Sequence, residues 1–253
     1  MKIEKSDRVY IGIGLAILVL LVVFGLFSSS SKPSVTSTNT TTTSGQSSSE
    51  SKTESRSKAK AEVIKTNWVA YTDSINTNWA IVTAVIQNTG ETNIRLNDAS
   101  GTVYGADGKV VGNSSDSVYP RILRPNEEAY MAVQIMNTVP KEDIKDAKVQ
   151  ISFDETNEEP IKLNAINDSG KKTSYDYEVV GELENASDKE VKDARALVLF
   201  FDKEENLINA EVAYPTPEII SPNGTVAFKA STSHLDEIVA SYKVVGFSMQ
   251  WGF

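Results

Sequence analysis

The sequence predicts an all-β protein in which two tandem β-sandwiches follow an N-terminal transmembrane helix and a disordered linker. Three observations lead to this prediction. An uncharged apolar run near the N-terminus precedes a long Ser/Thr-rich stretch. The rest of the chain repeats itself at an offset of 97 residues, and its apolar residues alternate with the period of two that is typical of β-strands.

The first element is the apolar run at residues 10–27, which contains no charged side chain. Eighteen residues are just enough to cross the hydrocarbon core of a bilayer as a helix. Basic residues precede the run, so we expect residues 1–9 to stay cytoplasmic and everything after Phe27 to lie outside the cytoplasm. These basic residues are Lys2, Lys5 and Arg8. The expected localisation is the cell membrane, with a single pass.

A cleaved signal peptide is the alternative for this segment. A secretory apolar region usually covers 7 to 15 residues and is followed by small residues, and Ser28–Ser31 could serve a signal peptidase. The longer run favours an uncleaved signal anchor. Residues 28–61 form the next element, a predicted disordered linker. Residues 28–57 contain 13 Ser and 7 Thr, and such a segment buries too little apolar surface to fold.

The charge of the chain is divided unevenly. The whole chain carries −9 and residues 1–61 carry a net +4, which leaves −13 for residues 62–253. Such an acidic region argues against nucleic-acid binding, which needs clustered Lys and Arg. The absence of Cys excludes disulfides and Cys-ligated metals, and a single His excludes a multi-His metal site.

An internal repeat divides the remaining residues into two predicted domains, 62–156 and 157–253. At an offset of 97, apolar positions agree and several turn residues are identical. Asn88 aligns with Asn185 and Pro120 aligns with Pro217, while Pro125-Asn126 aligns with Pro222-Asn223. Each copy has the size of a small β-domain, so we predict a duplication.

Strands are predicted wherever apolar residues alternate between turn signals. Residues 79–87 are apolar on both faces, whereas residues 175–184 alternate apolar and polar side chains. Short helical turns are expected at 140–145 and 234–239. Six or seven short strands per copy without long helices indicate a two-sheet Greek-key sandwich. Further strands are predicted at 129–136, 149–153, 225–231 and 242–249.

The second copy contains a motif that resembles FxLYD-type domains. Its Asn-rich turn at 184–188 precedes the strand Leu199-Phe-Phe-Asp202, and a turn and Leu207-Ile208 follow. In the first copy, Val103-Tyr104 stands at the matching place, but Gly105 occupies the position of the family's Asp. The resemblance implies an immunoglobulin-like β-sandwich of the kind found on bacterial and archaeal envelope proteins, without catalytic residues. It also implies that the aromatic fills the core and that the Asp caps the turn.

Candidate catalytic groups are few. His234 has Ser231, Thr232 and Ser233 as sequence neighbours, but residues adjacent in sequence rarely align a nucleophile with its base, so a capping or exposed His is expected. The carboxylate pairs Glu158-Glu159 and Glu204-Glu205 sit on predicted turns, where they would not face each other across a cleft as glycosidases require. We therefore expect no enzyme activity and assign no catalytic residue.

Metal and cofactor sites are not predicted either. The chain lacks the EF-hand spacing, a phosphate-binding loop and a dinucleotide fingerprint. Oxygen-bearing residues gather between residues 154 and 170, where a weak Ca²⁺ site is the one alternative, although turn chemistry explains most of them. These residues are Asn164, Asn167 and Asp168.

Aromatic residues could form a binding stripe, but those at alternate strand positions more often belong to the core. The candidates are Trp68, Tyr71, Trp79, Tyr130 and Trp251, of which Trp251, at the C-terminal edge, is the best exception. Ligand-binding residues therefore stay unassigned.

Together these features favour a membrane-anchored, extracytoplasmic binding or structural module of the cell envelope. Its partner would be a protein or an envelope polymer. Such a module predicts an exposed apolar or aromatic patch. The alternative is a subunit or assembly factor of an envelope complex, which predicts a face shared between the copies. An enzyme would instead need a pocket where polar groups converge, such as a cleft in which His234 meets an acid and a hydroxyl.

Overall fold

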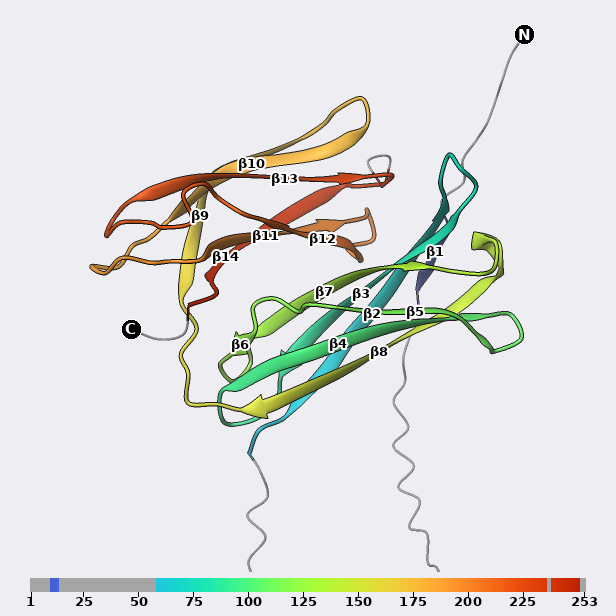
Figure 1. The fold of residues 1–253 in the computed structure, drawn as a ribbon, viewed down its shortest axis with the longest axis horizontal. Coiled ribbons are helices and arrows are strands. Elements are labelled where there is room, and N and C mark those ends of the chain that lie inside the picture. Colours follow the sequence, from blue (N-terminus) through green and yellow to red (C-terminus); the bar gives the residue numbers. More distant parts are fainter. Residues whose placement is uncertain (1–9, 14–57, 236–237, 251–253) are drawn as a thin grey trace, which may run out of the picture. The chain divides into compact units, whose positions relative to one another are not determined.

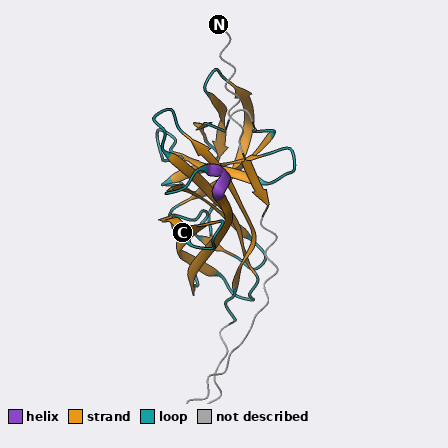
Figure 2. Ribbon diagram, turned by 90° about the vertical axis from the view of Figure 1, so that its right-hand side faces the viewer, coloured by secondary structure: helices purple, strands orange, loops and turns teal. Residues whose placement is uncertain are grey.

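A computed structural model describes residues 10–13, 58–235 and 238–250, which all belong to one compact unit. The protein is all-β, as the sequence predicts, and its strands form several sheets (Figures 1 and 2). Within the described residues, the single helical element is a short 3-10 turn at Lys141–Asp143. This turn lies inside the segment 140–145, where sequence predicts a helical turn.

The first half contains two sheets. One has the order β1-β2-β3-β7, and in the other β4 pairs with β5, β6 and β8. All neighbouring strands in both sheets are antiparallel. Their bounds are β1 Tyr10–Ile13, β2 Ala61–Thr72, β3 Asn78–Asn88, β4 Ile94–Gly105, β5 Val110–Asp116, β6 Ile122–Leu123, β7 Glu128–Met136 and β8 Ile144–Glu155.

A buried apolar cluster lies between these two sheets. Alternate residues of β3 and β7 face residues of β4 and β8 across the cluster, which is what a period of two produces when one face of each strand is buried. Packing of this kind is consistent with a β-sandwich. The cluster includes Val82, Ile86, Ile94, Leu96, Met131, Val133, Ile135 and Ile144.

The second half forms a six-stranded sheet in the order β12-β11-β14-β9-β10-β13. β9 joins its two parts, because its first residues pair with β14 and its remaining length pairs with β10. The strands are β9 Lys162–Lys172, β10 Asp176–Glu184, β11 Ala194–Phe201, β12 Leu207–Ala213, β13 Thr225–Ser233 and β14 Ser241–Ser248.

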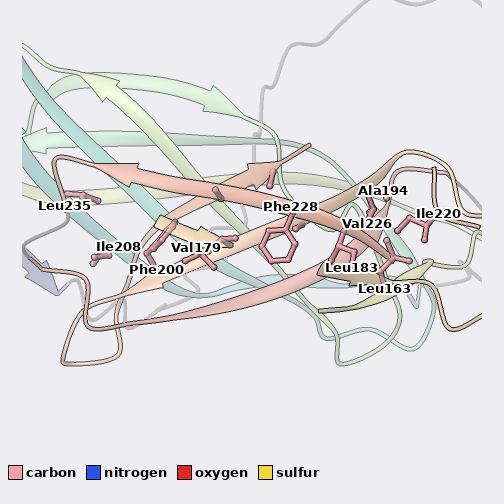
Figure 3. Packing of buried hydrophobic residues seen from close by; sticks show 14 of the residues in the cluster. Leu163, Val179, Leu183, Ala194, Phe200, Ile208, Ile220, Val226, Phe228 and Leu235 are labelled. Carbon is pink, nitrogen blue, oxygen red and sulfur yellow. The ribbon is translucent and has the colours of Figure 1, made fainter. Parts of the chain in front are cut away.

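The core of the second half fills the space between these parts of the sheet. Figure 3 shows Phe200, Val179 and Ile208 at one end of the cluster, and Leu183, Val226 and Phe228 toward the other. Phe200 is fully buried and meets the Tyr177 ring edge-on at 6.2 Å. Phe201, which precedes Asp202 at the aromatic position of the motif, is only half-buried and packs against a separate apolar cluster that includes Leu197 and Leu199.

The two halves share an apolar core. Side chains on the second face of the β2-β3-β7 sheet belong to the same cluster as the core of the second half, namely Val69, Tyr71 and Ile81. Thr83 Oγ1 donates a hydrogen bond of 2.6 Å to the carbonyl of Leu207, the first residue of β12, and Asn67 Nδ2 donates to the same carbonyl at 3.1 Å. One face of β3 packs within its own half and the other packs against the second half. Both faces of this strand are therefore apolar.

The offset of 97 residues holds in the hydrogen bonds as well. Asn88 is buried, and its Nδ2 donates to the carbonyls of Thr92 and Leu123, each at 2.9 Å. Asn185 is buried too, and its Nδ2 donates to the carbonyls 97 positions later, those of Lys189 and Ile220, at 2.7 and 3.1 Å. Each Asn thus binds carbonyls four and 35 residues further along the chain. The two halves therefore share one hydrogen-bond arrangement, as a duplicated sequence would produce.

The structure describes only residues 10–13 of the predicted transmembrane helix. Residues 10–13, the beginning of the predicted transmembrane helix, form β1 and pair with residues 67–70 of β2. An extended apolar segment can satisfy the free backbone groups at this sheet edge, which is a physical reason for the difference. No helix in the described part of the chain is long and apolar enough to cross a membrane. Residues 14–27 and the linker up to residue 57 lie outside the described residues.

One strand boundary needs a correction. Sequence alternation placed Tyr175 in the same strand as Tyr177, but β10 begins at Asp176 and Tyr175 lies in the preceding turn. The reason is local, since Thr173 takes its hydrogen bonds from the backbone of the turn and ends the ladder there. The helical turn expected at 234–239 falls partly on residues 236–237, which lie outside the described residues.

Candidate functional site

The hairpin between β2 and β3 ends in a turn that Asp73 holds. Asp73 Oδ1 accepts hydrogen bonds from the backbone N–H groups of Ile75 and Thr77 at 3.0 and 2.8 Å, while Oδ2 accepts from Trp79 Nε1 at 2.9 Å. The bond from Trp79 is the main cause of a lowered pKa for the Asp73 carboxyl. Ile75 stands at the tip with 81% of its surface exposed. A fixed turn therefore presents a large apolar side chain to solvent.

The equivalent hairpin of the second half, between β9 and β10, has a similar tip built from different residues. Thr173 Oγ1 accepts hydrogen bonds from the N–H groups of Asp176 and Tyr175 at 3.0 and 3.3 Å. Tyr175 is 82% exposed. These two tips carry the most exposed large apolar side chains among the described residues.

Both tips lie at the same end of the compact unit. Tyr71, two residues before Asp73, stacks on His234 with the ring centroids 5.1 Å apart. Ser233, the neighbour of His234, pairs with Asp176, which follows Tyr175.

Two other exposed apolar residues belong to this end. Met136 pairs with Trp79 at the start of β3, and the N–H of Thr138 donates to the carbonyl of Val111, next to Val110. We call the four exposed apolar residues at this end, Ile75, Val110, Met136 and Tyr175, the hairpin end.

The chain enters the described region at the opposite end of β2. The carbonyls of Lys58 and Lys60 accept backbone hydrogen bonds from Glu91 and Thr89, and Ala61 pairs with Asn88. β2 then runs for 12 residues toward Thr72, a length of about 40 Å for a strand. In the first half, the hairpin end therefore points away from the entry of the linker.

A polar cavity of about 420 Å³ opens between the halves beside the hairpin end. Gln134 of β7 and Tyr71 of β2 form part of one wall, and Gln134 Nε2 donates to the Tyr71 hydroxyl. β12 and β13 supply the facing wall. The other polar lining residues are Asp116, Asn209, Glu211, Ser231, Thr232, Ser233 and His234.

Two carboxylates dominate the charge of this cavity. Burial raises the pKa of the Glu211 carboxyl, and the negative charge of Asp116 raises it further. Asn209 Nδ2 partly compensates by donating a hydrogen bond of 2.8 Å to Glu211 Oε1. The lining contains no Lys or Arg within the described part of the chain. The cavity is therefore a negatively charged, hydroxyl-rich site.

His234 has an unusual setting in this cavity. Its φ angle of 64° places it in the left-handed region, which is uncommon for a residue with a side chain and is over-represented at functional sites. Its ring lies parallel to Tyr71 within 16°. Sequence reasoning expected an exposed or capping His, and the side chain is indeed exposed, but it did not foresee that carboxylates and hydroxyls would line the same cavity.

The cavity lacks the contacts of a hydrolytic site among the described residues. No hydrogen bond joins His234 to Ser231, Ser233 or Glu211 there, whereas a nucleophile and its base normally lie within hydrogen-bond reach. Its donors and acceptors instead suit the binding of a polar group.

A second open cavity, of about 440 Å³, follows the connection between the halves. Tyr130 and Phe247 contribute buried aromatic surface, while Lys162 and Lys243 provide charges at its edge. The Tyr130 hydroxyl donates a hydrogen bond of 2.8 Å to Glu128 Oε2, and burial raises the pKa of this hydroxyl. Because these side chains also pack the two halves together, we assign this cavity to the framework.

The sequence-based candidates are scattered in the structure. Glu158 pairs with Arg95, and Glu159 Oε2 accepts from Arg124 Nε at 2.8 Å, so this carboxylate pair is taken up by separate ion pairs. Glu204 and Glu205 belong to the turn after β11. Neither pair lines the polar cavity.

Two of the Ca²⁺ candidates make hydrogen bonds to carboxylates of the neighbouring strand. Asn164 and Asn167 donate hydrogen bonds to Glu184 and Glu182, at 3.0 and 2.8 Å. No group of three or more acidic or His side chains suited to a metal occurs in the described ranges.

The aromatic candidates Trp68, Tyr71 and Tyr130 are buried, as expected for core residues, and Trp251 lies outside the described residues. Sequence reasoning missed Ile75 and Glu211. A large apolar residue inside the turn sequence Asp73-Ser-Ile-Asn-Thr77 was the available signal for Ile75. Comparison with known protein families and with curated proteins finds no match.

Proposed function

We propose that this protein is a membrane-anchored, extracytoplasmic and non-enzymatic binding module of the cell envelope, whose head consists of two tandem immunoglobulin-like sandwiches. The observation that carries this proposal is the hairpin end. Several exposed large apolar side chains gathered at one end of a molecule are typical of a contact surface. The hairpin end also points away from the linker entry in the first half, as the contact end of a tethered head would.

The motif of the second half supports the FxLYD-type assignment within this proposal. Asp202 is buried, and its Oδ1 accepts from the N–H groups of Glu204 and Asn206 at 3.0 and 2.8 Å. This is the turn-capping role that the resemblance gives to the Asp. Phe200, at the position of the family's Leu, is fully buried, whereas Phe201, at the aromatic position, is half-buried against a separate apolar cluster.

The proposed anchor and the β1–β2 pairing exclude each other. Residues 10–13 cannot lie in a bilayer and pair with residues 67–70 at the same time. In the anchored protein this edge of β2 is therefore free. Because the chain has no Cys, a pair of introduced cysteines at Ile11 and Val69, which face each other in the register, tests the point. Disulfide formation in cell membranes would contradict the anchor.

Site-specific photo-crosslinking in intact cells tests the binding role. A photoreactive residue at Ile75 or Tyr175 should capture a partner. The matched controls are Ile64 and Tyr214, which are 47% and 61% exposed but lie away from the hairpin end. Equal capture from the control positions, or none from Ile75 and Tyr175, would remove the proposal.

The alternative, a subunit or assembly factor of an envelope complex, keeps one observation in its favour, since the copies share a face. In the structure that face is buried between the two halves of the same chain. Purification in detergent without a crosslinker separates the two functions. A stable complex gives one partner in fixed proportion that co-purifies in detergent, while a binding module gives a partner that is lost on washing.

A further inference from the structure

The polar cavity beside the hairpin end has an unbalanced charge. Glu211 is half-buried and accepts one hydrogen bond, from Asn209, and no ion pair to it occurs among the described residues. Burial of a carboxylate without a cation is unfavourable. The repulsion from Asp116 adds to this cost. A stable fold gains nothing from such an arrangement, so a ligand that brings positive charge is the natural complement.

The cavity walls limit the kind of cation. A volume of about 420 Å³ is larger than a bare ion needs and lies in the range of sites for organic groups. No cluster of metal-ligating side chains is present in the described residues. The exposed His234 ring, which stacks on Tyr71 with one face, lines one side of the cavity. A planar, delocalised cation that forks onto a carboxylate and stacks on an aromatic ring fits these walls.

The surroundings of the cavity indicate what carries this cation. The hairpin end offers apolar contacts from Ile75 and Tyr175, and residues 62–253 carry a net charge of −13. A protein surface with a basic side chain beside apolar residues matches both features, because complementary charge steers association and apolar anchors supply affinity.

We propose that the cavity between β7 and β12 is a binding site for an arginine side chain of a basic partner protein. This inference rests on the proposed binding function and names its partner class. The guanidinium group pairs with Glu211 and Asp116, and the hairpin end contacts the apolar residues around that arginine. The hydroxyls of Ser231 and Ser233 face the same cavity and accept its remaining N–H groups.

The test uses the full chain in detergent and a hexa-arginine peptide as the probe, followed by isothermal titration calorimetry. A hexa-citrulline peptide has the same shape without the charge and should not bind. The variant D116N/E211Q should weaken arginine binding about tenfold or more, since it removes two charge-assisted contacts.

The control variant D188N/E190Q changes the net charge by the same amount with exposed residues that do not line the cavity. It should change the affinity less than twofold. Equal weakening by both variants would mean non-specific attraction to an acidic protein and would overturn the proposal. Binding of hexa-citrulline as tight as that of hexa-arginine would also overturn it, as would preferential binding of chitotriose, a neutral saccharide probe.

A second readout does not depend on affinity. In a ¹³C-carboxyl NMR titration of the full chain, the pKa of Glu211 should fall when hexa-arginine is bound, because a cation favours the charged carboxylate. An unchanged pKa would contradict the site. If crosslinking from Ile75 and Tyr175 succeeds while both peptide tests fail, only the arginine site is wrong. If the peptide tests succeed while crosslinking from these residues fails, the proposed contact surface is wrong.

Discussion

The two halves of the molecule share a framework and differ at their tips. The Asn88 and Asn185 networks use equivalent donors and acceptors, and the turns at 105–109 and 202–206 have equivalent backbone hydrogen bonds. By contrast, the first hairpin tip depends on Asp73 and shows an Ile, whereas the second depends on Thr173 and shows a Tyr. The comparison teaches that the repeated residues hold the fold and the divergent ones provide the exposed surface.

The largest expected effect comes from breaking the shared framework. N88A and N185A should each lower the free energy of unfolding by about 3 kcal/mol, because each leaves buried carbonyls without donors. N113A, on the exposed part of β5, is the control. Urea denaturation followed by fluorescence measures the change. A loss below 1 kcal/mol in either variant would contradict the equivalence of the networks.

A smaller effect should separate the two turns. D202A removes a buried acceptor of three hydrogen bonds, from Glu204 N, Asn206 N and Asn206 Nδ2, and should cost about 2 kcal/mol. D107A, in the equivalent turn of the first half, removes an exposed carboxylate that accepts a hydrogen bond from the N–H of Lys109, and it should cost clearly less than D202A. The same denaturation experiment compares them, and equal losses would mean that the turns have not diverged in strength.

The contact between the halves provides the next test. T83V keeps the size of the side chain but removes the 2.6 Å hydrogen bond to the Leu207 carbonyl, so it should cost about 1 kcal/mol. Wild type and variant should each unfold in a single thermal transition, because the halves share one apolar cluster. Two separate calorimetric transitions in the wild-type protein would show that the halves unfold independently.

The smallest effect has the opposite sign. The pKa of Glu211 is raised in the folded protein, so folding favours the protonated carboxyl. The ionised carboxylate present at high pH therefore makes the folded protein less stable. The contribution of Glu211 to stability is fully present below its unfolded-state pKa, near 4.5. It is lost as the pH rises through the folded-state pKa. E211Q, which keeps an acceptor for Asn209, should therefore gain about 0.5 kcal/mol at pH 7. The gain should vanish at pH 4, and a stability loss at pH 7 would indicate a structural role instead.

Sequence reasoning reached the framework because that part of the fold is local or repeated. The alternation at 79–87 and 129–136 predicts β3 and β7, which span Asn78–Asn88 and Glu128–Met136. The offset of 97 predicts equivalent turns, since equal spacing of Asn and apolar residues reproduces equal hydrogen bonds. Apolar residues on both faces of residues 79–87 also carried a signal of the second interface, which only the packed structure explains.

The polar cavity could not be predicted in the same way. Gln134 and Glu211 lie far apart in the sequence, and no local pattern relates them. The cavity exists because β12 covers the outer face of the β2-β3-β7 sheet, and the placement of one half on another depends on the sum of many contacts. Tyr175 was misplaced for a smaller reason, since its spacing from Tyr177 continues the strand pattern beyond the turn.

The apolar cluster shared by the two halves has a consequence for proteolysis. A single cut in the connection between β8 and β9 severs the backbone but leaves Val69, Tyr71 and Ile81 packed against the second half. The nicked protein should stay together as a non-covalent pair of fragments under native conditions and separate only in denaturant. Its two parts would thus migrate as one particle in gel filtration and as two bands after denaturing electrophoresis.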